Sequence, residues 1–229
     1  MRMNIMSYQG PRGTDPATKS LSKLFCSSRE LQHQWWFMQE NSFHCCATET
    51  AFSNCICDFP ESVVEGHSLY CNDFLWPVFH KLDKSIHFKQ PDRQMFHQFN
   101  AFFAQSMLGF DQLSIVQPII ISGFHLALCP QLLYNCSGFR STFFWNLPWP
   151  EDVNRIYVPF VSEIALGLLH AQGLGFTSTE AASNFLAFVA KIMPNYRVDI
   201  PGRKIENMHE PEHSISIQFD PFDCGSSRN

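Results

Sequence analysis

Residues 141–155 read STFFWNLPWPEDVNR and contain a complete change of structure within one short stretch. The aromatic-rich run from Ser141 to Leu147 is typical of a strand, and Pro148 ends it. The polar residues that follow Pro150 are typical of a turn that leads into a helix. The stretch therefore predicts one strand-to-helix step, and the surrounding sequence decides whether this step is repeated.

The residues before this stretch predict another helix and strand. Apolar residues recur at helical spacing over residues 91–108 and form one core face; they are Met95, Phe96, Phe99, Phe102, Phe103 and Met107. Residues 113–124, LSIVQPIIISGF, are a nearly continuous apolar run bounded by Gly123, which predicts a strand buried on both faces of a parallel sheet. Pro118 within this run indicates an edge or a bulge. A short helix is expected at 127–136.

The residues after the opening stretch continue the alternation. Apolar residues throughout 151–171 predict a long, largely buried helix. The sequence GLGFTS at 173–178 predicts a third strand, and the next helix is expected to begin at Thr177, since Glu180 stands three residues later at capping-box spacing. The sequence SISIQF at 214–219 predicts a last strand.

The first 90 residues fit the same sheet. MNIMSY (3–8) and QWWFMQ (34–39) predict strands, and residues 17–32 predict a helix between them. Alternating strands and helices indicate right-handed crossovers, so we expect an α/β fold with a Rossmann-like parallel sheet and helices on both faces. Gly10 and Gly13 after the first strand do not complete a G-x-G-x-x-G fingerprint, so no dinucleotide cofactor is expected.

Charge and hydropathy exclude two classes of partner. The chain has 229 residues and a formal net charge of −5, and its 16 Lys and Arg residues are scattered, so a nucleic-acid surface is not expected. No window reaches the run of about 18 apolar residues that a membrane helix needs. We therefore predict no membrane partner and a soluble, cytoplasmic protein.

The nine cysteines do not indicate a secreted disulfide framework, because their number is odd and their spacing irregular. Cys45, Cys46, Cys55 and Cys57 could be combined with His44 into a zinc site. Paired C-x-x-C knuckles are absent, so buried and unreactive thiols are the favoured interpretation.

Five stretches carry a more specific signal. They are GHSLYCNDFLWPVFH (66–80), FNAFFA (99–104), GFHLALCPQLL (123–133), FFWNLPWPEDVNRI (143–156) and GLLHAQGLGFTSTEAASNFL (167–186). In this order they resemble the N-terminal half of glycosyltransferase family 20, which includes trehalose-6-phosphate synthases and glucosylglycerol-phosphate synthases. The resemblance covers about residues 1–220, which we expect to form one acceptor-side domain. Residues 221–229 are a polar tail at the start of the family's interdomain linker.

The resemblance implies an enzyme built from two Rossmann-like halves. The N-terminal half of such an enzyme holds the acceptor sugar phosphate, the C-terminal half holds the nucleotide sugar, and glucose is transferred with retention of configuration. This chain matches only the acceptor half, so we expect the donor half to be absent. No D-x-D pair accompanies the expected sugar-nucleotide site, so neither a metal nor another cofactor is implied.

Three positions depart from the family pattern. Gln9 stands where the family has an arginine that faces the donor phosphates, and Arg12 is the only nearby cation. Gly123 stands where the family has a carboxylate at the sugar site, and Asn146 replaces the histidine that contacts the transferred glucose. Glycine supplies only backbone groups and an amide only neutral hydrogen bonds, so we expect the chain to be inactive by itself.

The resemblance also places the candidate ligand contacts, which are Tyr70, Asn72, Trp76, His125 and Arg12. Trp76 matches a tryptophan of the acceptor site, and packing under the following proline turn is the alternative. His67 stands where trehalose-6-phosphate synthases have an acceptor-binding tyrosine, but we expect an exposed polar residue without a ligand. His125 matches the family's second histidine, and a supporting role is favoured over acid or base catalysis.

Three hypotheses about function follow. The first is a truncated trehalose-6-phosphate-synthase-like domain without activity of its own. The second is a non-catalytic sugar-phosphate-binding or regulatory subunit, which pairs with a separate donor domain or a full-length homologue through an exposed apolar surface. The third is the product of a decayed gene fragment that folds poorly.

Overall fold

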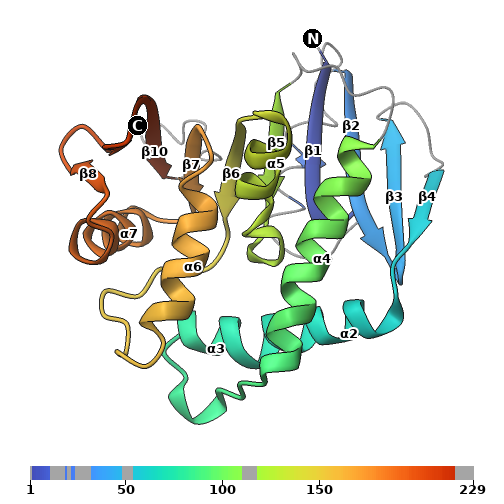
Figure 1. The fold of residues 1–229 in the computed structure, drawn as a ribbon, viewed down its shortest axis with the longest axis horizontal. Helices are drawn as coiled ribbons and strands as arrows, with labels where there is room; N and C mark the ends of the chain where they lie inside the picture. The colour runs from blue at the N-terminus through green and yellow to red at the C-terminus, as the bar shows by residue number, and fades with distance from the viewer. Residues whose placement is uncertain are drawn as a thin grey trace, which may run out of the picture.

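The computed structural model describes residues 2–10, 19, 22–23, 32–47, 54–109 and 118–219. They form one ten-stranded sheet with helices packed against it (Figure 1). The order of the strands across the sheet is β4-β3-β2-β1-β5-β6-β7-β10-β9-β8. This is an α/β fold, as the alternation of strands and helices in the sequence predicts.

Six central strands form the parallel part of the sheet. They are β2 (Gln32–Gln39), β1 (Arg2–Gln9), β5 (Ile119–Ser122), β6 (Ser141–Trp145), β7 (Gly173–Phe176) and β10 (Glu210–Phe219). Each neighbouring pair among them is parallel. Parallel neighbours place all their carboxyl ends along one edge of the sheet, which is the lower edge in Figure 1.

Both faces of the central sheet are buried. Successive side chains of a strand point to opposite faces of the sheet. Trp36 and Met38 of β2 belong to the large core cluster on one face. Trp35 and Phe37 of the same strand form a second cluster with Ile5 on the other face. The second cluster is small, and the large one takes in most of the molecule's buried aromatic side chains. A sheet that is buried on both faces explains the continuous apolar runs in the sequence.

Four antiparallel strands extend the sheet at its two ends. They are β3 (Ser42–Ala47) and β4 (Asn54–Asp58) at one end, and β9 (Lys204–Asn207) and β8 (Tyr196–Asp199) at the other. The sequence does not predict them. Burial raises the pKa of Cys45 in β3 to about 12, with Cys46 contributing, so this thiol stays protonated. The described part of the chain holds no group of three or more His, Cys, Asp or Glu that could bind a metal.

The helices are α2 (Glu61–Leu69), α3 (Trp76–Phe79), α4 (Gln90–Leu108), α5 (Cys129–Ser137), α6 (Val158–Leu168) and α7 (Thr179–Ile192). Three shorter segments join them, namely the π-helix η1 (Tyr70–Leu75) and the 3₁₀ turns η2 (Asp83–Ser85) and η3 (Phe124–Leu126). In Figure 1, α4 and α6 cross the sheet, while α2 and α3 lie along its lower edge. None of the helices in the described ranges is long and apolar enough to cross a membrane.

The helix predicted over residues 151–171 is too long, because α6 begins at Val158. The preceding residues form a turn around Asn154, whose backbone carbonyl accepts a hydrogen bond from the Tyr157 amide at 2.8 Å. The Asn154 side chain accepts a second bond from the Ile156 amide at 3.3 Å. Ile156 lies within the range of the predicted, largely buried helix, but it is 64% exposed.

The N-terminus of α7 lies close to its predicted position but uses a different cap. Ser178 is the N-cap, and its hydroxyl oxygen accepts a hydrogen bond from the Ala181 amide at 3.1 Å. The cap is therefore one residue later than Thr177. Serine and threonine are both good caps, so the sequence leaves this choice to the backbone geometry.

Other predictions fall partly or wholly outside the described residues. The strand predicted at 113–124 is seen as β5, which starts at Ile119 directly after Pro118. Most of the helix predicted at 17–32 and the whole tail at 221–229 lie outside the described ranges. The domain boundary at residue 220 stays a prediction.

Candidate functional site

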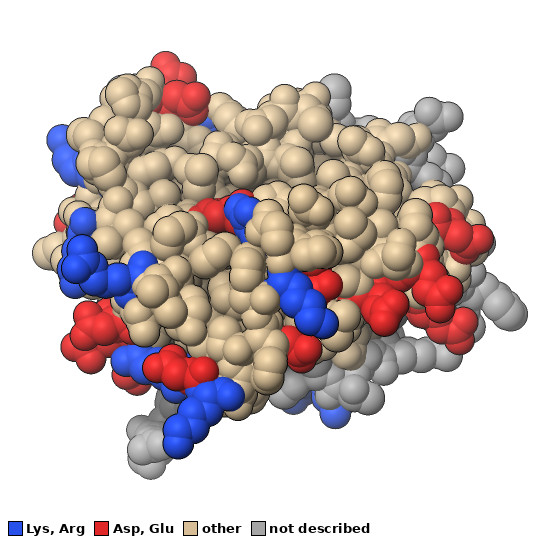
Figure 2. All heavy atoms as spheres, turned by 60° about the horizontal axis from the view of Figure 1, so that its bottom comes forward, with Lys and Arg blue, Asp and Glu red and all other residues tan. Residues whose placement is uncertain are grey.

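The carboxyl ends of β1, β5 and β6 meet at the lower edge of the sheet, where ligands of open α/β sheets usually bind. Gln9 is the last residue of β1, Gly123 follows β5 and Asn146 follows β6. The structure therefore brings all three altered positions to one edge. Figure 2 turns this edge toward the reader and shows a mostly uncharged surface, with acidic and basic side chains interspersed rather than gathered into one basic patch.

Gly123 and Asn146 are joined through the backbone of the loop after β5. Gly123 has a φ of 98°, which favours glycine, and its amide donates to the Phe144 carbonyl at 3.1 Å. The Asn146 side-chain oxygen accepts a hydrogen bond from the Phe124 amide at 3.0 Å. Asn146 thus stabilises the turn that carries Gly123 and His125.

The space in front of Gly123 is lined by two nitrogen atoms. A Cβ atom built on Gly123 would lie 3.8 Å from His125 Nδ1 and 4.0 Å from Asn146 Nδ2, and no other non-neighbouring atom of the described residues would lie within 4 Å. We call this space the Gly123 notch. It stands where the resemblance expects a carboxylate, and glycine supplies no charge there.

His125 is held in place by its own backbone and by aromatic contacts with Tyr8, Phe124 and His67. Its carbonyl oxygen accepts hydrogen bonds from His67 Nε2 at 3.0 Å and from Asn100 Nδ2 at 3.1 Å. Its ring stacks on Tyr8, with ring centroids 4.4 Å apart and planes 7° from parallel. Surrounding protein atoms lower the pKa of His125 to about 3, so the ring is neutral at physiological pH. This agrees with a supporting role.

The prediction that His67 is exposed is wrong. Its exposed fraction is 0%, and its ring stacks on Phe99 with centroids 3.7 Å apart. Burial, followed by the proximity of His125, lowers the pKa of His67 to about 3. The His67 side chain is stable in the core because its Nε2 donates to the His125 carbonyl. The sequence does not reveal this hydrogen bond, because the two residues are 58 positions apart.

The structure places Tyr70 in the aromatic core rather than in an open pocket. Its exposed fraction is 1%, and its ring centroid lies 5.0 Å from that of Phe74 and 5.1 Å from that of Phe96. Burial, with a smaller contribution from Glu163, raises the pKa of the Tyr70 hydroxyl well above its ordinary value. Tyr70 therefore lies in the aromatic core, and its role as a ligand contact stays a prediction.

Asn72 and Trp76 both lie at the surface. Asn72 belongs to η1 and donates to the Ser68 hydroxyl at 3.2 Å. Trp76 follows η1, is 40% exposed and stacks on His80 at 4.0 Å, so it does not pack under the proline turn. A π-helix is rare and frequently marks a functional site, and the sequence does not reveal this one. Arg12 lies outside the described residues.

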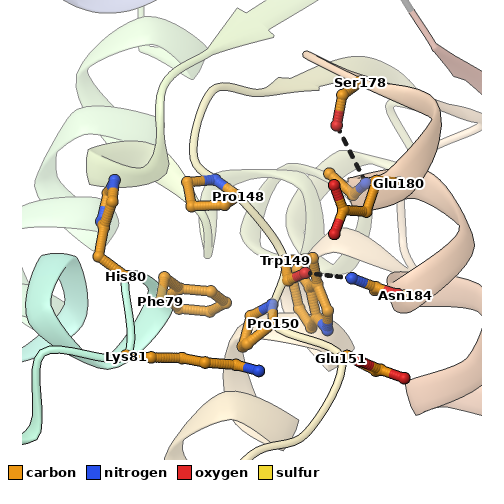
Figure 3. A pocket seen from close by; sticks show the side chains of 11 residues that line it. Phe79, His80, Lys81, Pro148, Trp149, Pro150, Glu151, Ser178, Glu180 and Asn184 are labelled. Atoms are coloured by element: carbon orange, nitrogen blue, oxygen red, sulfur yellow. Dashed lines mark hydrogen bonds between the residues drawn. The ribbon is translucent and has the colours of Figure 1, made fainter.

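A pocket of about 310 Å³ opens beside these positions (Figure 3). Its lining residues are Phe79, His80, Lys81, Pro148, Trp149, Pro150, Glu151, Ser178, Glu180, Ala181 and Asn184. Figure 3 shows Lys81 extending from the end of α3 toward Pro150, with Glu180 and Asn184 on α7 opposite. Asn184 donates to the Trp149 carbonyl at 2.9 Å and so ties α7 to the chain after β6.

The sequence does not reveal this pocket, because its charged groups come from three distant segments. Lys81 follows α3, Glu151 lies between β6 and α6, and Glu180 lies in the first turn of α7. Of the three charged residues, only Glu180 stands out in the sequence, and it does so as a helix-capping residue rather than as part of a pocket. The mixture of one ammonium group and two carboxylates does not select an anionic ligand.

Arg93 is already neutralised by an ion pair between two helices. Arg93, in the first turn of α4, donates from Nε to Glu163 at 3.1 Å and from its terminal nitrogen to the other carboxylate oxygen at 2.8 Å. His97 lies 3.0 Å from the same carboxylate. This bidentate pair joins α4 to α6 and leaves Arg93 committed to a structural contact.

Comparisons with known proteins give a consistent result. The model of glycosyltransferase family 20 matches residues 25–221. The alpha,alpha-trehalose-phosphate synthase (UDP-forming) of Yarrowia lipolytica is 28% identical over 134 residues, which are 54% of this chain and 28% of that protein.

Two solved structures share the fold. An E. coli structure described as trehalose-6-phosphate bound with UDP-2-fluoro glucose has a TM-score of 0.77 at 17% identity, and the match covers 97% of this chain and 49% of that one. The alpha,alpha-trehalose-phosphate synthase of Burkholderia xenovorans in complex with glucose-6-phosphate has a TM-score of 0.72 at 16% identity, with 96% and 49% covered. The chain thus spans about half the length of these structures.

Proposed function

Because the chain belongs to glycosyltransferase family 20, we propose that it is an acceptor-side domain of the trehalose-6-phosphate-synthase type that does not transfer glucose by itself. The solved relatives that share its fold bind UDP-2-fluoro glucose or glucose-6-phosphate, and the chain spans about half of their length. In this proposal a complete reaction requires groups that the 229-residue chain does not supply.

The observation that carries this proposal is the neutral character of the site. Gly123 provides no side chain, Asn146 is an amide engaged by the Phe124 amide, and the lowered pKa of His125 keeps its ring neutral. Preorganised charges aimed at the reacting groups are usually the largest contribution to catalysis. Each lost charged hydrogen bond costs about 1.5–3 kcal/mol, or roughly 10- to 150-fold in rate.

The test is a transfer assay with the purified chain. UDP-glucose is incubated with glucose 6-phosphate or glycerol 3-phosphate, and the release of UDP and the formation of a disaccharide phosphate or glucosylglycerol phosphate are measured. We expect no product above a boiled control, while the E. coli relative in the same assay shows that the reagents are active. Transfer by the isolated chain would contradict the proposal.

A second candidate function is a non-catalytic subunit that pairs with a donor domain or a homologue. Exposed apolar side chains between the start of α3 and the start of α6 favour this second function. They are Trp76 (40% exposed), Leu82 (41%), Phe88 (41%) and Ile156 (64%). Exposed apolar groups of this size are typical of interaction surfaces when they are contiguous. A monomer that shows no affinity for a full-length homologue in size-exclusion chromatography would count against this function.

The decayed-fragment hypothesis makes a different prediction about folding. A fragment that folds poorly melts without a cooperative transition, whereas a domain with a continuous core melts cooperatively. Calorimetry of the purified chain separates the two. The large cluster of buried aromatic and aliphatic side chains favours the cooperative outcome.

A further inference from the structure

The pocket between α3 and α7 is separate from the positions that the family resemblance assigns to a ligand (Figure 3). None of those positions that the structure describes, such as Trp76, Gly123 and Asn146, is among the residues that line it. Its volume of about 310 Å³ lies at the small end of the range for ligand pockets and suits a small metabolite. A ligand of this pocket would therefore occupy a site of its own.

The floor of the pocket consists of buried aromatic side chains. Phe79 and Trp149 are each 1% exposed, and their ring centroids lie 5.1 Å apart. Trp149 also packs edge-on against Phe185 of α7, with centroids 4.7 Å apart, and its carbonyl accepts from Asn184 at 2.9 Å. These contacts join α3, the chain after β6 and α7, so the walls of the pocket are already in place when a ligand arrives.

One wall carries the ammonium group of Lys81. This residue follows α3 and has a φ of 55°, in the left-handed region that lysine rarely adopts. Its amide donates to the Val78 carbonyl at 3.2 Å, and Figure 3 shows its side chain extending across the pocket toward Pro150. Within the described residues, the ion pairs do not include Lys81. Residues in rare backbone conformations cluster at functional sites.

The opposite wall, formed by α7, carries hydrogen-bond acceptors. Glu180 and Asn184 are four residues apart and so lie on the same face of the helix. The Trp149 carbonyl is an acceptor only, so the Asn184 atom that it contacts must be the nitrogen, which leaves the side-chain oxygen to a ligand. Glu151 adds a second carboxylate to the lining. In the part of the chain that the structure describes, neither glutamate forms an ion pair.

Charges of opposite sign thus face one cavity without contacting each other. An anion would be repelled by Glu180 and Glu151, and a cation would be repelled by Lys81. A neutral ligand would displace water from the charged groups without replacing its hydrogen bonds, which costs free energy. A zwitterion avoids these penalties, because each of its charges meets an opposite charge.

We propose that the pocket between α3 and α7 binds a free α-amino acid, whose carboxylate pairs with Lys81 and whose ammonium group pairs with Glu180 and the Asn184 oxygen. An apolar side chain on the amino acid suits the remaining space, because Pro148 and the aromatic floor line it. This inference goes beyond the proposed function, because it concerns a pocket that the acceptor-side positions do not line.

The first test compares matched ligands by NMR. The uniformly ¹⁵N-labelled chain is titrated with L-leucine and L-phenylalanine, and with the N-acetyl derivative and the amide of each. The indole N–H signal of Trp149 reports on the pocket, because Trp149 lines it and Nε1 has no hydrogen-bond partner among the described residues.

We expect at least one free amino acid to shift this signal and to bind at least about threefold more tightly than both of its derivatives, since each derivative lacks one charged group. Failure of both free amino acids to shift the Trp149 signal would overturn the inference. A derivative that binds as tightly as its free amino acid would overturn it as well.

The second test removes one charge from each wall. Lys81→Met should weaken the free amino acid by about 2- to 5-fold and leave the amide, which has no carboxylate, unchanged. Glu180→Gln should weaken the free amino acid by a similar factor and leave the N-acetyl derivative unchanged. This pattern pairs each side chain with one end of the ligand, as a double-mutant cycle does.

The matched controls are Lys84→Met in η2 and Glu65→Gln in α2, because both residues are exposed and neither lines the pocket. They should bind the amino acid like the unaltered chain. Unchanged binding in Lys81→Met or in Glu180→Gln would contradict the inference, and so would equal weakening of the amino acid and the derivative. Lys81 and Glu180 are exposed, so both variants are expected to fold.

These outcomes are separable from the proposed function. The transfer assay contains no amino acid, so its result does not depend on this pocket. A chain that transfers no glucose and binds no amino acid would keep the proposed function and refute the inference. A chain that binds an amino acid and also transfers glucose would do the reverse.

Discussion

Two glycines in this molecule meet opposite surroundings. At Gly167 in α6, an added Cβ would lie 2.5 Å from the Ala127 carbonyl oxygen and 3.2 Å from a methyl group of Leu128. At Gly123 the nearest non-neighbouring atom among the described residues would be 3.8 Å away. The first glycine allows a helix to approach the loop behind the site, whereas the second leaves room in the site itself. The contact of α6 at Gly167 therefore leaves no room for a side chain, whereas the backbone at Gly123 would accept a methyl group without a clash with the described residues.

The largest expected effect lies in the polar network behind the notch. Asn100 is completely buried, donates to the carbonyls of Phe96 and His125, and accepts from the Leu128 amide. Asn100→Ala should lower the free energy of unfolding by about 3 kcal/mol, because it leaves buried backbone groups unpaired. Urea denaturation measures this loss.

The matched control for this network is Asn72→Ala, because Asn72 is exposed and bonds only Ser68. We expect a change within about 0.5 kcal/mol for it. If the two substitutions lowered the free energy of unfolding equally, the buried hydrogen bonds of Asn100 would stabilise the fold no more than the exposed bond of Asn72.

The second prediction concerns the close contact of α6. Gly167→Ala should destabilise the fold by about 2 kcal/mol, because the backbone oxygen of Ala127 cannot move aside as a flexible side chain can. The midpoint of urea denaturation should fall while the slope stays constant. A neutral or stabilising result would show that α6 can shift away and that the framework is looser than its distances indicate.

The third prediction is a loss of stability in mild acid. The pKa of His67 is lowered to about 3 in the folded chain, whereas an unfolded histidine titrates near 6.5. The unfolded state therefore binds more protons below pH 6.5, and stability falls as the pH decreases toward 3. His67 alone should contribute a slope approaching roughly 1.4 kcal/mol per pH unit below this pH.

His67→Gln isolates this contribution. The glutamine amide can still donate to the His125 carbonyl but does not titrate. Between pH 6.5 and 5, urea melts should show a shallower pH dependence in the variant than in the unaltered chain. Parallel curves would mean that His67 titrates alike in both states.

The smallest expected effect is at Gly123 itself. Gly123→Ala meets no clash, so its cost should come only from the φ of 98° and amount to about 1 kcal/mol. A loss of stability larger than that of Gly167→Ala would reverse the comparison between the two glycines.

The sequence predicts the central sheet well, because its strands are short apolar runs that only a doubly buried position can explain. It fails where the pattern is ambiguous. Ile156 continues the apolar spacing of α6 but belongs to the turn closed by Asn154, and nothing in the spacing distinguishes the two cases. The antiparallel β3 and β4 are polar and rich in cysteine, so they lack a strand signature.

The sequence predicts which residues of the site lie close together, but it does not predict the burial or the hydrogen-bond partners of their side chains. The family resemblance brings Gly123, His125 and Asn146 together, and the structure confirms that they adjoin. The family resemblance cannot foresee that His67 is buried, because the hydrogen-bond partner of His67 is the His125 carbonyl, 58 residues away in the sequence. The pocket with Lys81 and Glu180 depends on the meeting of distant segments in the same way.

The π-helix η1 also constrains how this chain can be aligned with others. From α2 through η1 to α3 the backbone stays helical, and a π segment holds one residue more per turn than an α-helix closing the same distance. A single-residue deletion within Tyr70–Leu75 could therefore restore an ordinary helix. Because the ordinary helix would close the same turn with one residue fewer, Trp76 and every later side chain would keep the faces that they now occupy.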